Sequence, residues 1–325
     1  MRIESQPMPA RENDPKQISI SVVVCAYTGD RWDALLRAVE SILGQTFPPL
    51  ETIVVIDHDD LLLARARERF SGEDHIRILE NEDGPGLSGA RNTGLRSARG
   101  EVVAFLDDDA AAESDWLERL AAHYEEPAVL GVGGAIEPAW AAGRPKTFPP
   151  ELDWIVGCTY AGLPEQASRV RNVIGANMSF RRAVFDAVGG FDPSMGRTAH
   201  RPLGCEETEL CLRAQRRWPD GVIMYEPLAR VRHAVAPARE TWTYFLRRCY
   251  AEGLSKADVA RLAGRSAGLQ SERAYVTRVV PRAIARNAMG SISRRDPHLL
   301  GRAFRLVAGV AVTTAGYCAG SLRAR

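Results

Sequence analysis

The sequence contains no pair of cysteines at the spacing of a metal or redox motif. Its 325 residues include six cysteines, which are scattered and nowhere form a C-x-x-C pair. This pattern excludes a zinc ribbon and a dense disulfide scaffold. We therefore expect six reduced thiols, at Cys25, Cys158, Cys205, Cys211, Cys249 and Cys318.

The amino-terminal segment lacks the apolar core of a secretory signal. Residues 1–17 are polar and carry charges of both signs. We therefore predict a polar leader over these residues and catalysis in the cytoplasm.

The apolar stretches of a polytopic membrane protein are also absent. Residues 306–322 form one uncharged stretch of 17 residues with arginines on both sides. A spanning helix needs roughly 20 predominantly apolar residues, and this stretch contains three glycines. We favour an interfacial or re-entrant helix whose flanking arginines meet anionic lipid headgroups. A core helix packed on the domain is the alternative.

The composition is that of a soluble globular chain, with 45% hydrophobic and 26% charged residues and no internal repeat. It excludes a disordered or collagen-like protein. The length predicts one large α/β unit with an appendage, or two domains. We place a catalytic domain over 18–237 and a basic helical region over 238–325.

Positive charge is concentrated at the carboxyl-terminal end. Residues 239–325 hold 16 lysines and arginines but only 5 acidic residues, a net charge of +11, whereas the rest of the chain carries −10. Such asymmetry predicts contact with an anionic surface, either a membrane or a nucleic acid. A solvated arginine-rich helix face is the alternative. Because aromatic residues suited to base stacking are sparse in this region, we favour the membrane.

Strands and helices alternate through the first third of the chain. Strands are expected over Ile18–Cys25, Thr52–Ile56, Ile76–Leu79 and Glu101–Leu106, and helices over 32–43, Leu61–Phe70 and Ala90–Ala98. This order predicts a parallel sheet with right-handed crossovers, which binds ligands beyond the carboxyl ends of its strands.

The pattern changes after residue 128. Short strands are expected over Val129–Ile136, Val173–Phe180, Val222–Tyr225 and Ala229–His233, with short helices between them. Basic amphipathic helices are expected over Trp242–Leu262 and Tyr275–Met289. The second half therefore predicts a mixed sheet followed by helices.

Acidic residues follow two of the predicted parallel strands. Asp107, Asp108 and Asp109 come directly after a buried strand, and Asp57 follows another. Three adjacent carboxylates repel one another, and Mg²⁺ or a similar hard cation bound with substrate phosphates would neutralise them. A solvated turn is the alternative. Tyr27, after the first strand, can stack on a nucleobase.

Three further positions can carry chemistry. The glycine-rich loop before Arg91 opens a helix, where anions bind readily. Glu206 and Glu207 begin another helix, and one of them can act as a general base, although acids are also favourable in a first helical turn. His233 follows a strand and is a candidate third metal ligand, or a structural histidine.

Taken together, these residues resemble the family-2 glycosyltransferases of the GT-A fold, over about residues 18–237. The motifs that carry the resemblance are Ile20–Val24 with Tyr27, Val54–Asp57, Gly89–Gly94, Phe105–Asp109, Asn177–Arg182, Gly189–Asp192 and Glu206–Leu210. The resemblance implies an α/β fold with a Rossmann-like mixed sheet flanked by helices, and an inverting, metal-dependent enzyme.

The resemblance also implies roles for single residues. The nucleotide-binding positions are Cys25, Ala26, Tyr27, Asp57, Arg91, Asp107 and Asp108. Asp107 and Asp109 correspond to the D-x-D motif that binds Mn²⁺ or Mg²⁺, with His233 as a later metal ligand. Glu207 stands where the family places its catalytic aspartate, and Glu206 remains the alternative base.

Within the family, the chain resembles a group that transfers glucuronic acid to a polyprenyl- or dolichyl-linked sugar. This likeness favours a UDP-sugar donor, a lipid-linked acceptor, no nucleic acid partner and a peripheral position on the inner face of the cell membrane. Arg171, Arg181 or Arg197 could pair with a uronate carboxylate.

Three other classes of protein fit the sequence less well. A dehydrogenase and a nucleotidyltransferase both need a glycine-rich motif after the first strand, which the chain lacks there. A non-catalytic membrane- or nucleic-acid-binding module would leave the acidic strand ends unexplained.

Overall fold

A computed structural model describes residues 17–196, 204–263 and 270–322. Arg197 and nearly all of the predicted polar leader lie outside these ranges. The described residues form two compact units. The first contains 17–135, Glu165–Met195 and Glu206–Arg232, and the second contains Ile136–Pro164, 204–205, 233–263 and 270–322.

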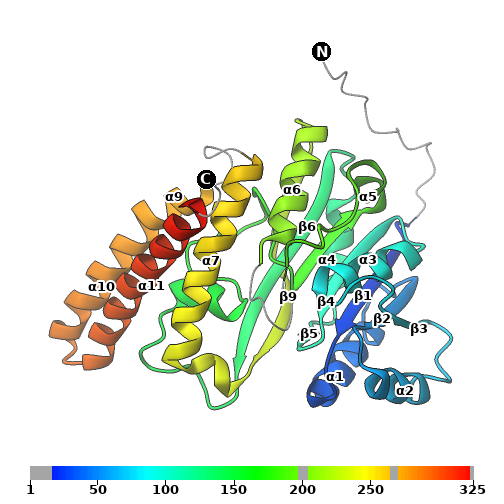
Figure 1. The fold of residues 1–325 in the computed structure, drawn as a ribbon, viewed down its shortest axis with the longest axis horizontal. Helices are drawn as coiled ribbons and strands as arrows, with labels where there is room; N and C mark the ends of the chain where they lie inside the picture. The colour runs from blue at the N-terminus through cyan, green and yellow to red at the C-terminus, as the bar shows by residue number, and fades with distance from the viewer. Residues whose placement is uncertain (1–16, 197–203, 264–269, 323–325) are drawn as a thin grey trace. The chain divides into compact units, whose positions relative to one another are not determined.

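The first unit is built on four parallel strands, as the sequence predicts. They are β1 (Ile20–Ala26), β2 (Glu51–Ile56), β3 (Ile76–Glu80) and β4 (Val102–Asp107), in the order β3-β2-β1-β4. The connecting helices are α1 (Trp32–Leu43), α2 (Asp60–Arg69) and α3 (Leu87–Ser97). The β-branched residues of β1, β2 and β4 are almost fully buried, which is typical of parallel strands covered on both faces. Figure 1 shows these strands side by side.

The sheet continues with strands of mixed direction, which confirms the predicted mixed architecture. β8 (Asn177–Arg181) pairs antiparallel with β4 and with β6 (Val129–Trp140). β9 (Val222–Val235) and β5 (Ala110–Ala112) follow β6 in the sheet, and the short β7 (Ser168–Arg169) pairs antiparallel with β9. The helices of this half are α4 (Trp116–His123), α5 (Arg182–Val188) and α6 (Glu206–Arg217).

Two predicted strand boundaries are wrong. The predicted strands Val222–Tyr225 and Ala229–His233 are one strand, because the Glu226 carboxylate accepts a hydrogen bond from the Leu228 N–H (2.9 Å) and the chain stays extended past Pro227. β8 begins at Asn177 rather than Val173, because residues 174–177 turn, with the Asn177 N–H donating to the Ile174 carbonyl at 3.1 Å.

The core of the first unit lies between the sheet and α3, α5 and α6. Phe105 of β4 meets Phe185 and Phe191 edge-to-face, with ring centroids 6.1 and 5.3 Å apart. Such pairs contribute about 0.5–1.5 kcal/mol beyond the area that they bury. This packing holds β4, and therefore the acidic residues that follow it, in a fixed position.

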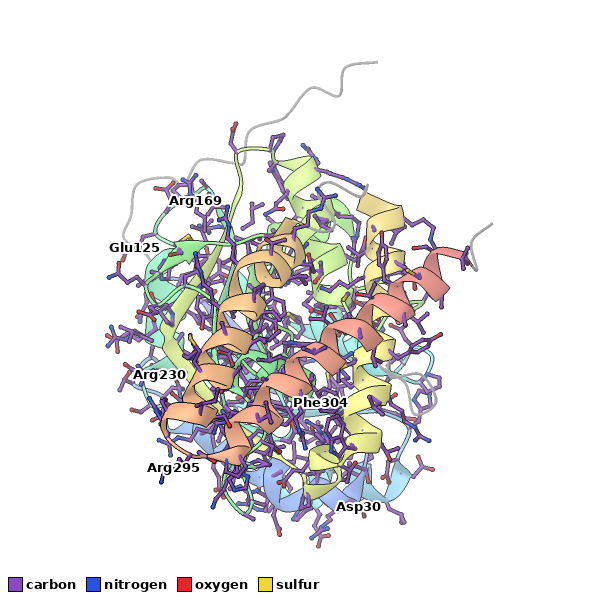
Figure 2. All side chains as sticks on the ribbon, turned by 90° about the vertical axis from the view of Figure 1, so that its left-hand side faces the viewer. Asp30, Glu125, Arg169, Arg230, Arg295 and Phe304 are labelled. Carbon is purple, nitrogen blue, oxygen red and sulfur yellow. The ribbon has the colours of Figure 1, made fainter. Side chains whose placement is uncertain are left out.

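The second unit is mainly helical. Its long helices are α7 (Trp242–Ala263), α10 (Val280–Ser293) and α11 (Pro297–Leu322), and the short α9 (Gln270–Ala274) lies between α7 and α10 in the sequence. Figures 1 and 2 show α11 lying beside α7 and α10. The predicted helix Tyr275–Met289 instead starts with a π-helical turn over 275–279, and the α-helix proper begins at Val280, where Pro281 suits the first turn.

All six cysteines are reduced, as predicted, and none of them forms a disulfide. Burial raises the pKa of Cys211 and Cys249 to about 12. These two thiols therefore remain protonated near neutral pH.

Helix α11 is longer than the predicted uncharged stretch. It has 26 residues and includes Arg302 and Arg305. By length and composition it could cross a membrane, and 28% of its most apolar 18-residue window is buried. Most of this apolar window is therefore not covered by the described protein.

Glycines allow α7 and α11 to pack closely, and replacing one of them should destabilise the protein. A Cβ on Gly316 would lie 2.2 Å from the Tyr250 carbonyl oxygen, whereas one on Gly309 meets nothing closer than 3.5 Å. We expect Gly316→Ala to lower the free energy of unfolding by about 1–3 kcal/mol through overpacking. The measurement is urea unfolding followed by circular dichroism.

Gly309→Ala is the matched control for this change. It should leave stability unchanged or raise it by up to about 1 kcal/mol, because alanine is the better helix former. Equal effects of the two alanines would show that the close α7–α11 approach contributes nothing to stability.

Candidate active site

The three adjacent aspartates lie at the end of β4, next to the end of β1. Asp107 is the last residue of β4 and pairs in register with Cys25 of β1. Its side chain is partly exposed, whereas those of Asp108 and Asp109 are only 5% and 8% exposed. Two of the three carboxylates therefore depend on neighbouring groups rather than on water.

Asp107, Asp109 and His233 form a possible metal site. Their candidate ligand atoms all lie within 4.8 Å of one another. Two carboxylates and an imidazole suit Mn²⁺ or Mg²⁺, which prefer oxygen donors and accept nitrogen. Oδ2 of Asp108, next in sequence to both aspartates, is buried without a hydrogen-bond partner. The residues present therefore fit a divalent cation.

The imidazole of His233 is buried on β9 and has a neighbour that orients it. The Cys158 sulfur lies 3.8 Å from Nδ1 of His233. A Cβ added to Gly157, whose φ is +87°, would lie 3.9 Å from Cε1 and Nε2 of the ring. A ring held at Nδ1 can present Nε2 to a metal ion.

Arg31 is a site residue that no motif in the sequence singles out. Its Nη1 lies 3.0 Å from Oδ1 of Asp108 and 3.1 Å from Oδ2 of Asp109. The guanidinium also stacks over the Tyr27 ring at 5.1 Å. Burial opposes the charge of Arg31, but the two aspartates together raise its pKa. A cation thus stabilises the acidic pair from within the protein.

The ionisation of Asp108 depends on burial and on the charges next to it. Burial and the neighbouring charge of Asp109 raise the pKa of Asp108 to about 7, although Arg31 opposes this shift. Additional positive charge at this site would therefore favour the ionised carboxylate.

Replacing Arg31 should destabilise the protein in a way that a divalent cation relieves. Arg31→Gln leaves the carboxylates of Asp108 and Asp109 buried next to each other without their cation. We therefore expect the free energy of unfolding, measured in the presence of a chelator, to fall by about 2 kcal/mol. Mn²⁺ should recover part of this loss because it neutralises the same carboxylates. Urea unfolding with and without Mn²⁺ measures both effects, and Arg31→Lys serves as the charge-conserving control.

Arg91 is buried and holds two acidic residues of the site. Its Nη1 donates to Oε1 of Glu206 at 2.8 Å, and its Nη2 lies 3.3 Å from Oδ1 of Asp107 and 3.0 Å from the Gly175 carbonyl oxygen. Burial opposes its charge, but Glu206 and Asp107 raise its pKa overall. Arg91 thus links α3, β4 and the start of α6, and its direct contact with a nucleotide stays a prediction.

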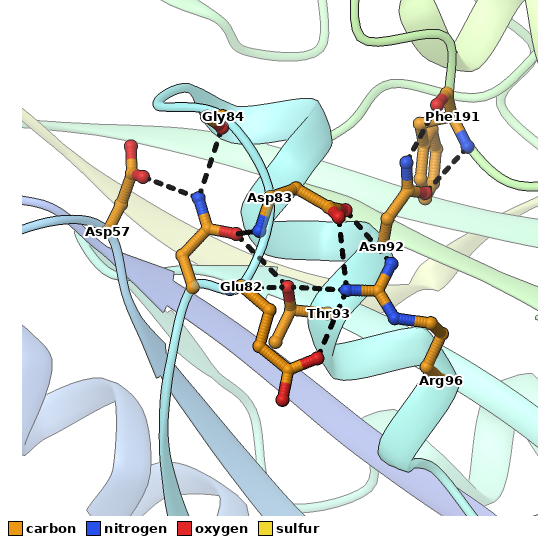
Figure 3. A network of polar contacts seen from close by, with 9 residues as sticks. Asp57, Glu82, Asp83, Gly84, Asn92, Thr93, Arg96 and Phe191 are labelled. Carbon is orange, nitrogen blue, oxygen red and sulfur yellow. Dashed lines mark hydrogen bonds and ion pairs between the residues drawn. The ribbon is translucent and has the colours of Figure 1, made fainter.

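Asp57 joins the end of β2 to the loop before α3. Its Oδ1 accepts a hydrogen bond from Asn81 at 2.6 Å, and its Oδ2 accepts one from the Gly86 N–H at 2.8 Å. Figure 3 shows the surrounding network, in which Thr93 and Arg96 of α3 contact the same loop. Asp57 therefore fixes this loop as well as closing its strand.

The first two residues of α6 differ in their surroundings. Glu206 is 4% exposed and paired with Arg91, whereas Glu207 is half-buried. Cys205, just before them, has a φ of +76°, which is uncommon for a residue other than glycine. This conformation sets the direction in which α6 starts.

The arginines considered for a uronate carboxylate have other contacts. Arg181 donates to the backbone carbonyls of Val129 and Tyr124 at 2.8 and 2.7 Å. Arg171 donates to the side chain of Asn172 at 2.8 Å. Arg181 therefore has a structural role that the sequence did not reveal.

Comparison with known proteins decides the family. The sequence model described as Glycosyl transferase family 2 matches residues 21–189. A protein of Haloferax volcanii named glucosyl-dolichyl phosphate glucuronosyltransferase is 38% identical over 240 residues, covering 74% of this chain and 76% of that protein. The chain belongs to glycosyltransferase family 2.

Other relatives of this family-2 glycosyltransferase are more distant. The pre-mycofactocin glycosyltransferase of Mycobacterium tuberculosis is 27% identical over 230 residues, which are 69% of this chain and 44% of that protein. The family assignment decides against the nucleotidyltransferase and the non-catalytic module considered from the sequence.

Solved structures of glycosyltransferases share the fold. The mannosyltransferase PcManGT from Pyrobaculum calidifontis, in complex with GDP-Man and Mn²⁺, superposes with a TM-score of 0.59 at 18% identity, covering 95% of this chain and 90% of that chain. GalNAc-T7 with UDP, GalNAc and Mn²⁺ gives 0.54 at 18% identity, covering 74% and 48%. These likenesses confirm the GT-A fold predicted for this family-2 glycosyltransferase.

Proposed function

We propose that this family-2 glycosyltransferase transfers glucuronic acid from a UDP-sugar to a hydroxyl of a polyprenyl- or dolichyl-linked sugar, with inversion at the anomeric carbon. The observation that carries the donor half is the cluster of Asp107 and Asp109, at the carboxyl end of the parallel strand β4, with His233 of β9. The name of the Haloferax relative supports the choice of sugar and acceptor.

The donor site proposed here is at the ends of β1, β2 and β4. Tyr27 is 52% exposed and is the ring available to stack on the uracil, and Asp57 lies at the end of the neighbouring strand. Cys25, Ala26 and Asp108 provide the adjoining wall, with Arg91 behind Asp107. Mn²⁺ or Mg²⁺ held by Asp107, Asp109 and His233 would offset the charge that develops on the leaving diphosphate.

The general base in this proposal is Glu207. Glu206 is held in an ion pair with the buried Arg91, so its charge is already used to balance a buried cation. Glu207 takes the proton of the acceptor hydroxyl while that oxygen attacks the anomeric carbon and the bond to the diphosphate breaks. One base and one displacement give inversion without a covalent enzyme intermediate.

The experiment that tests the function is turnover with a defined donor and acceptor. The protein is incubated with Mn²⁺, UDP-glucuronic acid and a polyprenyl- or dolichyl-phosphate-linked glucose, and the lipid product is identified by mass spectrometry. UDP-glucose, UDP-N-acetylglucosamine and GDP-mannose are the comparison donors. Product from UDP-glucuronic acid with inverted anomeric configuration supports the proposal, and transfer only from another donor overturns the choice of sugar.

Membrane association is part of the same proposal. The second unit presents α11, an apolar helix whose most apolar window is mostly uncovered, and the region from residue 239 carries a net charge of +11. A peripheral position on the cytoplasmic face of the cell membrane would bring the enzyme to a lipid-linked acceptor.

A further inference from the structure

Arg305 is an unusual cation in the second unit. It lies on α11, and the residue is only 6% exposed. Its guanidinium carbon sits 4.5 Å from the ring centroid of Trp242, 5.5 Å from that of Phe148 and 5.7 Å from that of Phe245. Three aromatic rings, two from α7 and one from the segment of Phe148, thus surround one arginine.

This arginine has no anion to balance it among the described residues. Its Nε and Nη1 are buried and make no hydrogen bond, and no carboxylate of the described chain forms an ion pair with it. Ring faces attract a cation, but they do not satisfy N–H donors. An apolar residue of the same length would fill this position at lower cost in stability. The charge therefore points to an anionic ligand.

Positive charge gathers around the same end of α11. Nε of Arg302 donates to the Lys146 carbonyl oxygen at 2.8 Å, which places the backbone of Lys146 beside this helix. Arg294 and Arg295, just before the helix, are both exposed. The helix dipole adds to this potential, because α11 begins at Pro297. Asp296 is the one acidic residue between 294 and 305.

The surface beside Arg305 is apolar rather than polar. Phe304 is 63% exposed, Leu300 is 59% exposed and Val307 is 53% exposed, all on α11. On α7, Trp242 and Leu246 are each 41% exposed, and the rings of Trp242 and Phe304 are 6.0 Å apart. Figure 2 shows Phe304 on α11 and Arg295 near the start of that helix. Cations at one end of an exposed apolar helix face complement a lipid, which has a charged head and apolar chains.

We propose that Arg305, with Arg302 and Lys146, binds the phosphate of a lipid whose chain is covered by the exposed faces of α7 and α11. The inference rests on the proposed function, because a lipid-phosphate-linked acceptor carries this chemistry. Arginine suits the role because its planar fork can form two parallel hydrogen bonds to phosphate. The apolar surroundings favour a lipid phosphate over inorganic phosphate.

The test is vesicle binding by the full-length protein and two matched variants. Arg305→Met removes the charge but keeps an apolar side chain of similar length, and Arg282→Met makes the same change at an exposed arginine of α10, outside the proposed site. Cosedimentation uses phosphatidylcholine vesicles containing dolichyl phosphate, or phosphatidylglycerol at the same total charge. We expect Arg305→Met to bind the dolichyl phosphate vesicles about tenfold more weakly and Arg282→Met to bind within about twofold of wild type.

Thermal stability separates ligand binding from a structural role. Because Arg305→Met removes a buried, uncompensated charge, its Tm should rise by a few degrees while lipid binding falls. A lower Tm together with weaker binding would mean that Arg305 supports the fold, and that outcome overturns the proposal. Arg305→Lys keeps the charge but not the fork, and we expect it to recover only part of the binding.

Two other results would overturn the site. One is binding of Arg305→Met to dolichyl phosphate vesicles with wild-type affinity. The other is equal wild-type affinity for phosphatidylglycerol and dolichyl phosphate vesicles, since that indicates attraction to any anionic surface. Weaker binding of wild type after addition of soluble inorganic phosphate at low concentration would assign the site to free phosphate instead. UDP binding with Mn²⁺, measured on the same samples, reports separately on the proposed donor site.

Discussion

Replacing Glu207 with glutamine should lower kcat by about a thousandfold and leave UDP binding nearly unchanged. General acid–base catalysis contributes roughly 10²–10⁴-fold to a rate, and the amide cannot accept the acceptor proton. Glutamine keeps the size of the side chain, and Glu207 is only half-buried, so the fold should tolerate the change. The measurement is steady-state transfer, with calorimetric binding of UDP and Mn²⁺ to the same variant.

Glu206→Gln is the informative comparison. It removes the anion that balances Arg91, whose Nη1 lies 2.8 Å from Glu206 and whose Nη2 lies near Asp107. We expect this variant to lose stability and to bind UDP more weakly, because Arg91 no longer holds both acidic residues. Glu207→Asp should keep part of the turnover, since it retains a carboxylate that is one methylene shorter.

The opposite pattern would exchange the two roles. If Glu206→Gln abolishes turnover with normal stability and normal UDP binding, while Glu207→Gln remains active, Glu206 is the base. Loss of UDP binding in Glu207→Gln would instead place this residue in the donor site.

The parallel half of the fold and its acidic strand end were predictable because they depend on local sequence. The β-branched residues of β1, β2 and β4 indicate buried parallel strands, and each strand's end places the next polar residue at one edge of the sheet. The run of Asp107, Asp108 and Asp109 therefore emerged from the pattern, whereas the choice of Asp107 and Asp109 as metal ligands followed from the family resemblance. The structure places the ligand atoms of these two aspartates within 4.8 Å of those of His233.

Contacts between distant segments could not be predicted in the same way. Arg31 lies in a short turn after β1, and nothing in its neighbourhood indicates that it pairs with Asp108 and Asp109, 77 and 78 positions later. The aromatic surroundings of Arg305 come from residues as far apart as Phe148 and Trp242. In both cases the partner is determined by tertiary packing, which periodicity does not report.

Strand boundaries failed for a related reason. The sequence predicts separate strands over Val222–Tyr225 and Ala229–His233, but the Glu226 side chain accepts the hydrogen bond of the Leu228 N–H and the strand continues. The continuous strand matters for the site, because its far part carries His233. A side-chain hydrogen bond of this kind has no signature in hydrophobic periodicity.

The second large effect concerns the metal-dependent part of donor binding. We expect Asp109→Asn to weaken UDP binding in Mn²⁺ by about a hundredfold, because it removes one charge from the three-residue group that can hold the cation. In chelator the variant and wild type should bind UDP alike, since the contribution of the cation is absent from both. Calorimetry with Mn²⁺ and with chelator measures the four affinities.

A matched control and a second ligand variant sharpen this prediction. Asp115→Asn removes a carboxylate whose ion-pair partner among the described residues is the exposed Arg119, at 2.9 Å, and UDP binding should stay within about twofold. Asp109→Asn also removes an anion that pairs with Arg31, so part of its effect could come from the lost ion pair rather than from lost metal binding.

His233→Ala distinguishes these two causes, because it removes a candidate metal ligand on another strand and leaves the ion pair of Arg31 intact. It should lose Mn²⁺-dependent UDP binding as Asp109→Asn does. If both variants keep wild-type affinity in Mn²⁺, these residues do not hold the cation, and the proposed donor site at the end of β4 is wrong.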